Sequence, residues 1–564
     1  MSIHARKRTA ALLAVTSAVA ALVTANPVTQ AAGASPIAKP VFTDAVAHDL
    51  SPSLALLAAQ SRATKQTASP LAAERGPLPS GSDQFSGDAA RQTAGATALV
   101  GPTIQNFEGA ASQDNFNVFG FRVNPPDPNG EVGPNHYVET VNLTFSIYSK
   151  TGTALVPPTA IGALWKGFAV ADCTDPSGDP VVLYDQFMDR WLLSQFTTRG
   201  PEYFNCVAIS ATSDPTGAYY RYAFSTGLNF PDYPKYGNWT DSYVITTREF
   251  GPTNEYGIGV YGLEKNKMVN GQPARMVRFF LDGNNPTILP LVGDGLLPAD
   301  VDGNTKPRTD AAIPLVGSQD DNWVYGATSD ALNVWNLSVK WRATPIASIA
   351  FASQLPVASF DSDFPCKPGS RDCLPQPAIT NPHQYLDILS YRQRPTWRLA
   401  YRNWGTYESL VTNQSVEALP GIAGMRWYEL RRTGSSYSVF QQGTYAPNDG
   451  VHRWMGSVAQ DKRGNMAAGY SVVNATTVYP GIRYSGRTAG AALGTFDLGE
   501  GVIVNGSGVQ TTTNSRWGDY TSMTVDPVDD CTFWYVNEYY TAAGQASSRA
   551  GWQTRIASFK LPGC

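Results

Sequence analysis

The sequence predicts an all-β protein whose body is a single β-propeller. Three observations support this fold class. Turn-forming residues are plentiful, with 51 glycines and 40 prolines in 564 residues, and they separate short runs rich in β-branched and aromatic residues. One stretch of the chain reads as a complete four-stranded meander. The same strand–turn–aromatic signal then recurs along the chain, as repeated sheets require.

The N-terminal 32 residues are predicted to be a secretory signal peptide. Basic residues within 4–8 precede an uncharged apolar stretch, 10–23, and small residues then offer cleavage sites at Ala25 or Ala32. The apolar stretch is short for a membrane span and no later segment qualifies, so we expect a secreted, extracellular protein without a membrane anchor. Residues 33–102 are rich in small and polar residues, and we predict a disordered linker or pro-segment there.

The clearest meander lies between residues 180 and 225. Strands are predicted over 180–185, 190–197, 204–211 and 218–225, and Asp214-Pro215-Thr216-Gly217 has the composition of a type I turn. A four-stranded meander cannot bury both of its faces alone, so it must stack on similar neighbours.

The strand–turn–aromatic signal occurs seven times and predicts seven four-stranded blades. Its anchors are Tyr137, Trp191, Tyr243, Trp323, Trp397, Met466 and Trp534. The spacing exceeds a minimal blade and leaves room for loops. The wide step from Tyr243 to Trp323 keeps six or eight blades open as alternatives.

The last unit contains only three predicted strands, at 521–525, 531–540 and 552–561. A fourth strand must come from elsewhere to cover its open edge. The β-rich segment 103–121 has no blade of its own, so we expect it to supply this strand and close the ring. The propeller is therefore predicted to span residues 103–564.

The six cysteines fit an oxidising compartment and contain no C-x-x-C pair, which disfavours thiol catalysis and zinc binding. Cys531 begins one strand and Cys564 follows its antiparallel neighbour, so the two can lie opposite each other. We predict the disulfides Cys531–Cys564, Cys173–Cys206 and Cys366–Cys373.

Several long segments resemble those of a group of exported bacterial proteins that has no assigned activity. The segments are NGEVGPNHYVETVN (129–142), GDPVVLYDQFMDRWLLSQF (178–196), SDPTGAYYRYAF (213–224), YRNWGTYESLV (401–411), HRWMGSVAQDKRGNMAAGYS (452–471) and RWGDYTSMTVDPVDDCTFWYVNEYY (516–540). The resemblance covers nearly all of the chain from residue 103 and implies export and architecture. A more distant likeness is to sialidase-type and polysaccharide-lyase propellers, although the S-x-D-x-G-x-T-W box is absent.

Charge and composition exclude some partners. The formal charge is −4 and no basic stripe runs along the chain, so nucleic-acid binding is not expected. We expect a monomer that needs no cofactor and contains no catalytic metal. The ion most compatible with the channel is a structural calcium, held by carboxylates and carbonyls.

The inner strands of a propeller all run the same way, so residues at their starts converge at one channel mouth, where ligands bind by default. The predicted catalytic residues are Asp232 and Asp519, then Asp179, His383 and His452. The predicted substrate-binding residues are Tyr233, Arg453, Trp454, Arg516 and Trp517. Carboxylates, arginines and aromatic rings at one mouth suit an acidic or hydroxyl-rich sugar.

Each of these residues also has a structural interpretation. An Asp at a strand start often caps a turn, an Arg can pair between blades, and a Trp can pack between them. Three functions therefore stay open. The first is a carbohydrate-active enzyme, either a glycoside hydrolase or a lyase in which His383 or His452 is the base and Tyr233 or Tyr401 the acid. The others are a non-catalytic propeller that binds a polysaccharide or surface glycan, and an envelope protein-interaction scaffold.

Overall fold

The computed structural model describes residues 37–62, 87–93, 96, 98–253, 255–321, 325–362, 364, 371–388 and 394–564. About half of these residues lie in β-strands and few lie in helices, which confirms the all-β class. The predicted signal peptide, residues 1–32, lies outside the described ranges, as does Cys366 of the predicted Cys366–Cys373 pair. None of the helices within these ranges has both the length and the apolar character needed to cross a bilayer.

The first three sheets are antiparallel meanders in chain order. The first contains β4 (Asn129–Val132), β5 (His136–Val141), β6 (Thr144–Ser149) and β7 (Ala154–Ala160). The second contains β8 (Val182–Asp185), β9 (Arg190–Phe196), β10 (Tyr203–Ser210) and β11 (Tyr219–Gly227), which confirms the meander predicted between residues 180 and 225. The third contains β12 (Phe230–Asn238), β13 (Ser242–Phe250), β14 (Tyr256–Glu264) and β15 (Arg275–Asp282).

Two further meanders are joined into one eight-stranded sheet. One contains β16 (Leu297–Val301), β17 (Ile313–Gln319), β18 (Ala331–Lys340) and β19 (Ile346–Pro356). The other contains β20 (Thr396–Asn403), β21 (Glu408–Leu419), β22 (Ile422–Thr433) and β23 (Ser436–Tyr445). The junction is a short parallel pairing between the two first strands, β16 and β20, so each half keeps its own antiparallel order.

The last two sheets follow the same plan. One contains β24 (His452–Gln460), β25 (Met466–Val473), β26 (Gly481–Arg487) and β27 (Leu498–Val504). The other contains β28 (Ser522–Val525), β29 (Phe533–Tyr540) and β30 (Trp552–Phe559), and its fourth strand is β3 (Gln105–Ala111). Pairing of β3 with β30 confirms that the segment 103–121 supplies the missing strand.

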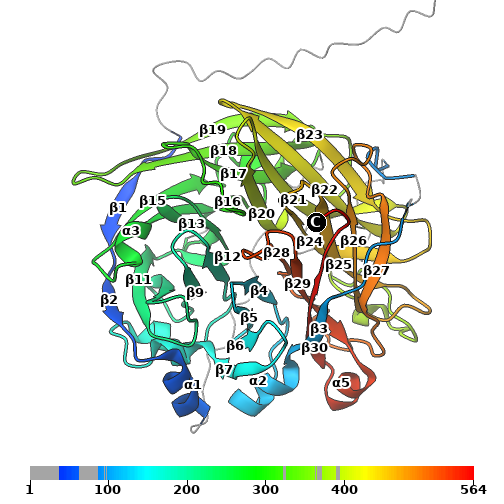
Figure 1. Ribbon diagram of the computed structural model, residues 1–564, viewed down its shortest axis with the longest axis horizontal. Coiled ribbons are helices and arrows are strands. Elements are labelled where there is room, and N and C mark those ends of the chain that lie inside the picture. Colours follow the sequence, from blue (N-terminus) through cyan, green and yellow to red (C-terminus); the bar gives the residue numbers. More distant parts are fainter. Residues whose placement is uncertain are drawn as a thin grey trace, which may run out of the picture. The chain divides into compact units, whose positions relative to one another are not determined.

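The first strands of these meanders contact one another in series: β4 contacts β8, and the contacts continue through β12, β16, β20 and β24 to β28, which contacts β4. The sheets are therefore arranged as blades of a β-propeller around the strands that begin them (Figure 1). The first and last sheets also share a core, in which the rings of Tyr137 and Trp534 stack with centroids 5.4 Å apart. Burial of such aromatic pairs dominates the energetics of packing between sheets.

Helices are short and lie in the connections. They are α1 (Leu54–Arg62), α2 (Ser112–Phe119), α3 (Lys265–Met268), α4 (Leu289–Val292), α5 (Ala542–Ser547), η1 (Ile161–Trp165), η2 (Ala171–Thr174) and η4 (Pro382–Gln384).

Part of the segment predicted to be a disordered linker is instead folded onto the sheets. β1 (Val41–Asp44) pairs with β15 and β2 (Ala47–Leu50) pairs with β11, so each adds a fifth, outer strand to its sheet. Further along, Asp88 forms a buried ion pair with Arg426 of β22 at 2.9 Å. The prediction failed here because these strands depend on hydrogen bonds to the open edges of distant strands, which local composition does not reveal.

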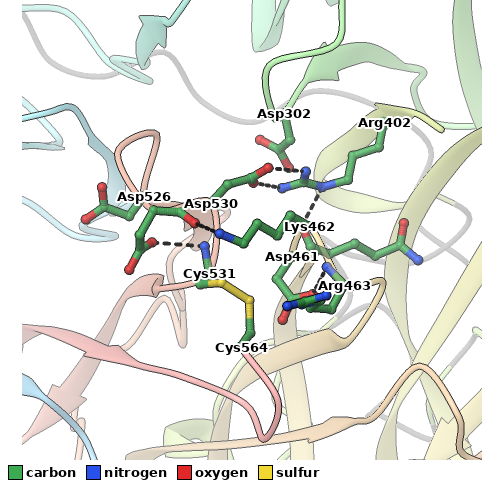
Figure 2. Close-up of polar contacts among 12 residues, drawn as sticks. Asp302, Arg402, Asp461, Lys462, Arg463, Asp526, Asp530, Cys531 and Cys564 are labelled. Carbon is green, nitrogen blue, oxygen red and sulfur yellow. Dashed lines mark hydrogen bonds and ion pairs between the residues drawn. A yellow bond between two sulfur atoms is a disulfide. The ribbon is translucent and has the colours of Figure 1, made fainter. Parts of the chain in front are cut away.

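At the rim where the first strands end, polar contacts join three sheets (Figure 2). Arg402 of β20 donates to Asp530, with Nη1 3.0 Å from Oδ2, and the Lys462 backbone N–H donates to the Asp530 carbonyl at 2.9 Å. Asp461 accepts the N–H groups of the turn that follows it, at 2.8 and 3.0 Å. These acidic side chains at the turns therefore have structural partners.

Two of the predicted disulfides are confirmed, Cys173–Cys206 and Cys531–Cys564. The second ties the start of β29 to the chain beyond β30 and closes a loop with a sequence separation of 33 residues.

Replacing Cys531 and Cys564 together by Ala should lower the free energy of unfolding by about 3–4 kcal/mol, because the unfolded chain regains the entropy of that loop. Chemical denaturation of the oxidised double variant measures this loss; an unchanged midpoint would contradict it.

A buried arginine links several of the first strands. Arg398 of β20 is buried and bonds Asp300 of β16 through Nη1 at 2.7 Å and Asp302 through Nη2 at 2.7 Å. Its Nε donates to the carbonyl of Met523 on β28 at 3.1 Å. One arginine therefore joins three first strands across the channel.

Candidate functional site

At the end of the channel where the first strands begin, a cavity of about 370 Å³ opens. This volume lies in the range of small-molecule sites. The lining residues come from the starts of four sheets and from neighbouring loops. They are Asn124, Pro125, Asp127, Asn142, Asp179, Phe196, Phe230, Asp232, Tyr233, Arg248, Arg371, Asn514, Arg516 and Asp519. Asp232, Asp519, Asp179, Tyr233 and Arg516, all singled out from the sequence, therefore line one cavity.

Three successive sheets place a side chain in this lining by the same local device. Asp127, Asp179 and Tyr233 each have a positive φ, of 48°, 51° and 53°, and each is followed directly by a proline. Positive φ is unfavourable for a residue with a Cβ, least so for Asp and Asn, and it persists where the surrounding structure enforces it. This repeated conformation places the three side chains around one mouth. The unfavourable backbone conformation is therefore associated with the cavity lining.

Asp127 connects two sheets beneath the cavity. Its Oδ2 accepts from Asn142 Nδ2 at 2.6 Å and its Oδ1 accepts from the Asp519 backbone N–H at 2.6 Å. Burial, assisted by the neighbouring Asp519 carboxylate, raises the pKa of Asp127 to about 7. Asp127 is therefore a carboxyl group that holds a proton far more readily than an exposed aspartate does.

Asp179 lies beside it, at the start of the second sheet. The Tyr520 hydroxyl donates to Asp179 Oδ2 at 3.1 Å, and the Asp179 backbone N–H donates to Asn142 Oδ1 at 2.9 Å. Burial, together with the carboxylates of Asp127 and Asp232, holds the pKa of Asp179 well above its usual range. The neutral, protonated form of this side chain is thus favoured at the cavity wall.

The other two carboxylates of the lining are paired with arginines. Asp519 Oδ1 lies 2.7 Å from Arg516 Nη2, and Asp232 Oδ2 lies 3.8 Å from Arg248 Nη1. These side chains keep part of their surface open to solvent, with 12% exposed for Asp519 and 20% for Asp232. The cavity therefore combines buried acids that favour the proton with accessible carboxylates that face a guanidinium.

An apolar wall completes the cavity. Phe196 and Phe230 are buried there and meet edge to face, with ring centroids 5.1 Å apart. Aromatic faces beside hydrogen-bonding groups can hold the apolar face of a sugar ring while its hydroxyls are bound.

Sequence reasoning missed Asn142, Arg248 and Arg371 as lining residues. Arg248 lies on β13, the second strand of its sheet, directly opposite Asp232 of β12, and this register brings it to the mouth. No motif marks these positions.

Arg453, predicted to bind substrate, lies elsewhere. Its buried guanidinium bonds Glu500 of β27 through Nε at 2.8 Å and Asp449 through Nη2 at 2.7 Å. Glu500 also pairs with Arg483 at 2.6 Å. Arg453 therefore stabilises one sheet from within and does not line the cavity, which corrects the prediction.

Trp454 and Trp517, predicted to stack on substrate, are both fully buried. They pack on each other with ring centroids 5.1 Å apart, and Trp517 Nε1 donates to Ser471 Oγ at 3.2 Å. A ring covered on both faces cannot stack on a sugar, so these residues are corrected to packing between sheets.

His383, a predicted base, lies just outside the lining. Its Nδ1 is 3.0 Å from Asp372 Oδ2, and its side chain is 68% exposed. Asp372 also accepts from Ser515 Oγ, next to Arg516. His383 thus supports the loop that carries Arg516.

His452, the other predicted base, is buried beneath the ring of Phe364 and accepts the Ala423 backbone N–H at Nδ1, at 3.2 Å. Burial, assisted by the Arg453 charge, lowers the pKa of His452 to about 4. It does not line the cavity, so its role as the catalytic base is corrected to a structural one.

A pH-dependent loss of stability should follow from His452. The unfolded chain binds a proton near pH 6.5 and the folded chain only near pH 4, so stability is present above pH 6.5 and is lost as the pH falls towards 4. The expected contribution is about 3 kcal/mol. Urea denaturation of His452→Gln at pH 4.5 and 7.5 measures it: the variant should lose less stability between these values than the wild type. An identical loss in both proteins would refute this assignment.

Among the residues that the structure describes, one group of carboxylates is close enough to share a metal ion: Asp320, Asp321 and Asp330. It lies near the end of β17 and outside the channel where calcium was expected. Both Asp330 oxygens accept backbone N–H groups, at 3.0 and 2.9 Å, and Asp320 accepts the Ser362 N–H at 2.7 Å. Hydrogen bonds within the fold therefore explain the positions of Asp320 and Asp330 in this group.

No protein-family description matches the chain. No curated protein matches it either. The predicted membership of a group of exported bacterial proteins thus stays a resemblance.

Solved structures show slight likenesses. The polysaccharide lyase Uly1 is 9% identical, with 84% of this chain and 95% of that chain covered and a TM-score of 0.34. An endo-arabinase from Bacteroides thetaiotaomicron is 11% identical, with 54% and 92% covered and a TM-score of 0.25. The α-L-arabinofuranosidase Arb93A from Fusarium graminearum is 9% identical, with 60% and 99% covered and a TM-score of 0.26. At such TM-scores these likenesses support no inference about the activity of this chain.

Proposed function

We propose that the protein is a secreted glycoside hydrolase that cleaves a polysaccharide or surface glycan at the mouth of a single, closed, seven-bladed propeller. The seven four-stranded groups and the contact of β28 with β4 support the closed ring. The confirmed disulfides support an oxidising, extracellular compartment.

The proposal rests on one observation: two carboxyl groups in the same cavity have different surroundings. Asp179 is held in a buried setting that favours its neutral form, while Asp232 is accessible and faces Arg248. Glycoside hydrolysis needs such a pair, one carboxyl group to give a proton and one carboxylate to receive one.

We assign the roles accordingly. Asp179 donates its proton to the glycosidic oxygen as the bond from the anomeric carbon to that oxygen breaks. Asp232 takes a proton from the attacking water, whose oxygen bonds the anomeric carbon. Arg516 and Arg371 supply cationic donors for carboxylate or hydroxyl groups of the sugar, and Phe196 and Phe230 supply the apolar wall.

The same geometry favours hydrolysis over a lyase reaction. A lyase needs a base that can remove a proton beside a uronate carboxylate, which the sequence assigned to His383 or His452. Neither histidine lines the cavity, and burial raises the pKa of the Tyr233 hydroxyl, which makes it a poor base at neutral pH.

A panel of polysaccharides incubated with the purified protein tests the proposal. Release of reducing ends without absorbance from unsaturated uronates is the result expected of a hydrolase. Unsaturated products would show a lyase. Binding without any product would show a non-catalytic glycan-binding protein.

The proposed acid also sets the pH dependence of turnover. Because burial raises the pKa of Asp179, the acid keeps its proton to a higher pH than an exposed aspartate does, and kcat/KM should fall only well above that range, as the proton is lost. Initial rates measured between pH 4 and 9 on the best substrate give the pH at which kcat/KM begins to fall. A decline that begins near pH 4, the range of an exposed aspartate, would contradict the assignment of Asp179 as acid.

A further inference from the structure

A second, much smaller cavity lies against the first. Its volume is about 10 Å³, close to the space that a single water molecule occupies. Tyr233 and Arg248 line both cavities, so they form the wall between them. The small cavity is also lined by Lys235 and Arg394, which brings three cationic side chains to a space that fits one atom.

Lys235 is a buried lysine whose strongest electrostatic partner is Asp179, a carboxyl group of the larger cavity. The side chain is 1% exposed, and its Nζ is buried without a hydrogen-bond partner in that part of the chain. The Nζ lies 2.9 Å from the centroid of the Tyr233 ring and 3.6 Å from that of Tyr520. These ring faces favour a cation, but they supply no counter-ion for an ammonium removed from water.

Arg394 is similarly short of acceptors. It is 1% exposed and pairs with Asp294 through Nη1 at 3.0 Å, while its Nε lacks a partner among the described residues. The same Asp294 carboxylate is shared with Arg248, whose Nη2 lies 2.9 Å away. The five residues before Arg394, 389–393, include no Asp or Glu, so the adjoining chain adds no carboxylate.

We propose that this small cavity binds one monatomic anion of the halide class, chloride in a physiological medium. Lys235, Arg394 and Arg248 all line this space. Lys235 Nζ and Arg394 Nε are buried donors without a hydrogen-bond partner among the described residues. A water molecule would accept a hydrogen bond but would bring no negative charge to these basic side chains, and a metal cation would be repelled by all three of them. A sugar carboxylate is too large for the space.

The anion has a structural consequence for the larger cavity. It would fix Lys235 and Tyr233 from below, and the Tyr233 ring forms part of the cavity wall above. This inference concerns binding alone and does not require that the protein be an enzyme.

Thermal unfolding of the full protein in sodium bromide or chloride, compared with gluconate at equal ionic strength, tests the proposal in solution. The midpoint should rise with halide concentration in a saturable way, by at least about 2 °C, because an anion that binds only the folded state stabilises it. Lys235→Met should lose this rise. Lys340→Met, which changes an exposed lysine, should keep it.

Crystals of the wild-type protein soaked in bromide supply a test that does not depend on how a variant folds. An anomalous peak between Lys235 Nζ and the Arg394 guanidinium is the expected result. Bromide only at surface positions, or a midpoint with the same halide dependence in Lys235→Met as in the wild type, would overturn the proposal. Loss of hydrolytic activity would bear on the proposed function and not on this site.

Discussion

Replacing Asp179 by Asn should lower kcat by about 10²–10⁴-fold while leaving the folded protein intact. The amide has the size of the carboxyl group and lacks the proton that the leaving oxygen needs. Burial already favours the neutral form of Asp179 in the folded state, so exchanging one neutral group for another should change stability little. Turnover of the substrate found in the polysaccharide panel, with the thermal midpoint measured on the same sample, checks both parts.

The matched control is Asp310→Asn, which alters an exposed aspartate that does not line the cavity and lies 3.8 Å from the exposed Lys340. Its activity and midpoint should equal those of the wild type. Full activity in Asp179→Asn would remove Asp179 from the role of acid. A large fall in its midpoint would show instead that this carboxyl group is ionised and structurally required.

Replacing Arg398 by Met should destabilise the protein by about 3–5 kcal/mol, because it leaves the buried Asp300 and the partly buried Asp302 without their partner. Asp300 and Asp302 each bond this arginine at 2.7 Å, and Arg398 has almost no exposed surface. The larger part of the cost is the uncompensated charge that remains, since a methionine of similar length keeps much of the packing.

This loss should itself depend on pH. Burial raises the pKa of Asp300 to about 6, against the opposing effect of Arg398, so protonation near pH 5 removes part of the buried charge. The difference in unfolding free energy between Arg398→Met and the wild type should therefore be smaller at pH 5 than at pH 8. Denaturant titrations at both values measure it, with the exposed Arg342→Met as control. Equal losses at both values would show that packing, not charge, accounts for the effect.

Much of the architecture could be predicted from the sequence. The meander between residues 180 and 225 could be predicted because its strands and turns are adjacent in the chain. The Cys531–Cys564 pair followed from the antiparallel neighbours β29 and β30, and the donation of β3 to β30 followed from counting strands in an incomplete sheet. The first two inferences needed only neighbouring residues, whereas the third compared the two ends of the chain.

The candidate site was predicted in part, for a physical reason. A position at the start of a first strand is fixed by chain direction, and this brought Asp179, Asp232 and Asp519 to one mouth. Which way a side chain points at such a start depends on backbone φ and on neighbouring sheets. Trp454 and Arg453 therefore turned out to be buried within and between sheets, although they lie at a comparable place in the sequence.

The basic residues beneath the mouth were beyond sequence reasoning. Lys235 lies two residues after Tyr233 on the same strand, and nothing in the string PDYPKYGN marks it as a buried lysine without a hydrogen-bond partner among the described residues. Its setting is created by Tyr520, Arg248 and Arg394, which come from three other parts of the chain.

The location of the substrate is the most direct test of the account. Asp179→Asn, crystallised with an oligosaccharide cut by the wild-type enzyme, should hold that ligand in the cavity with a glycosidic oxygen beside residue 179 and the anomeric carbon facing Asp232. An oligosaccharide bound on an outer face of the sheets, with the cavity occupied by solvent alone, would contradict the account.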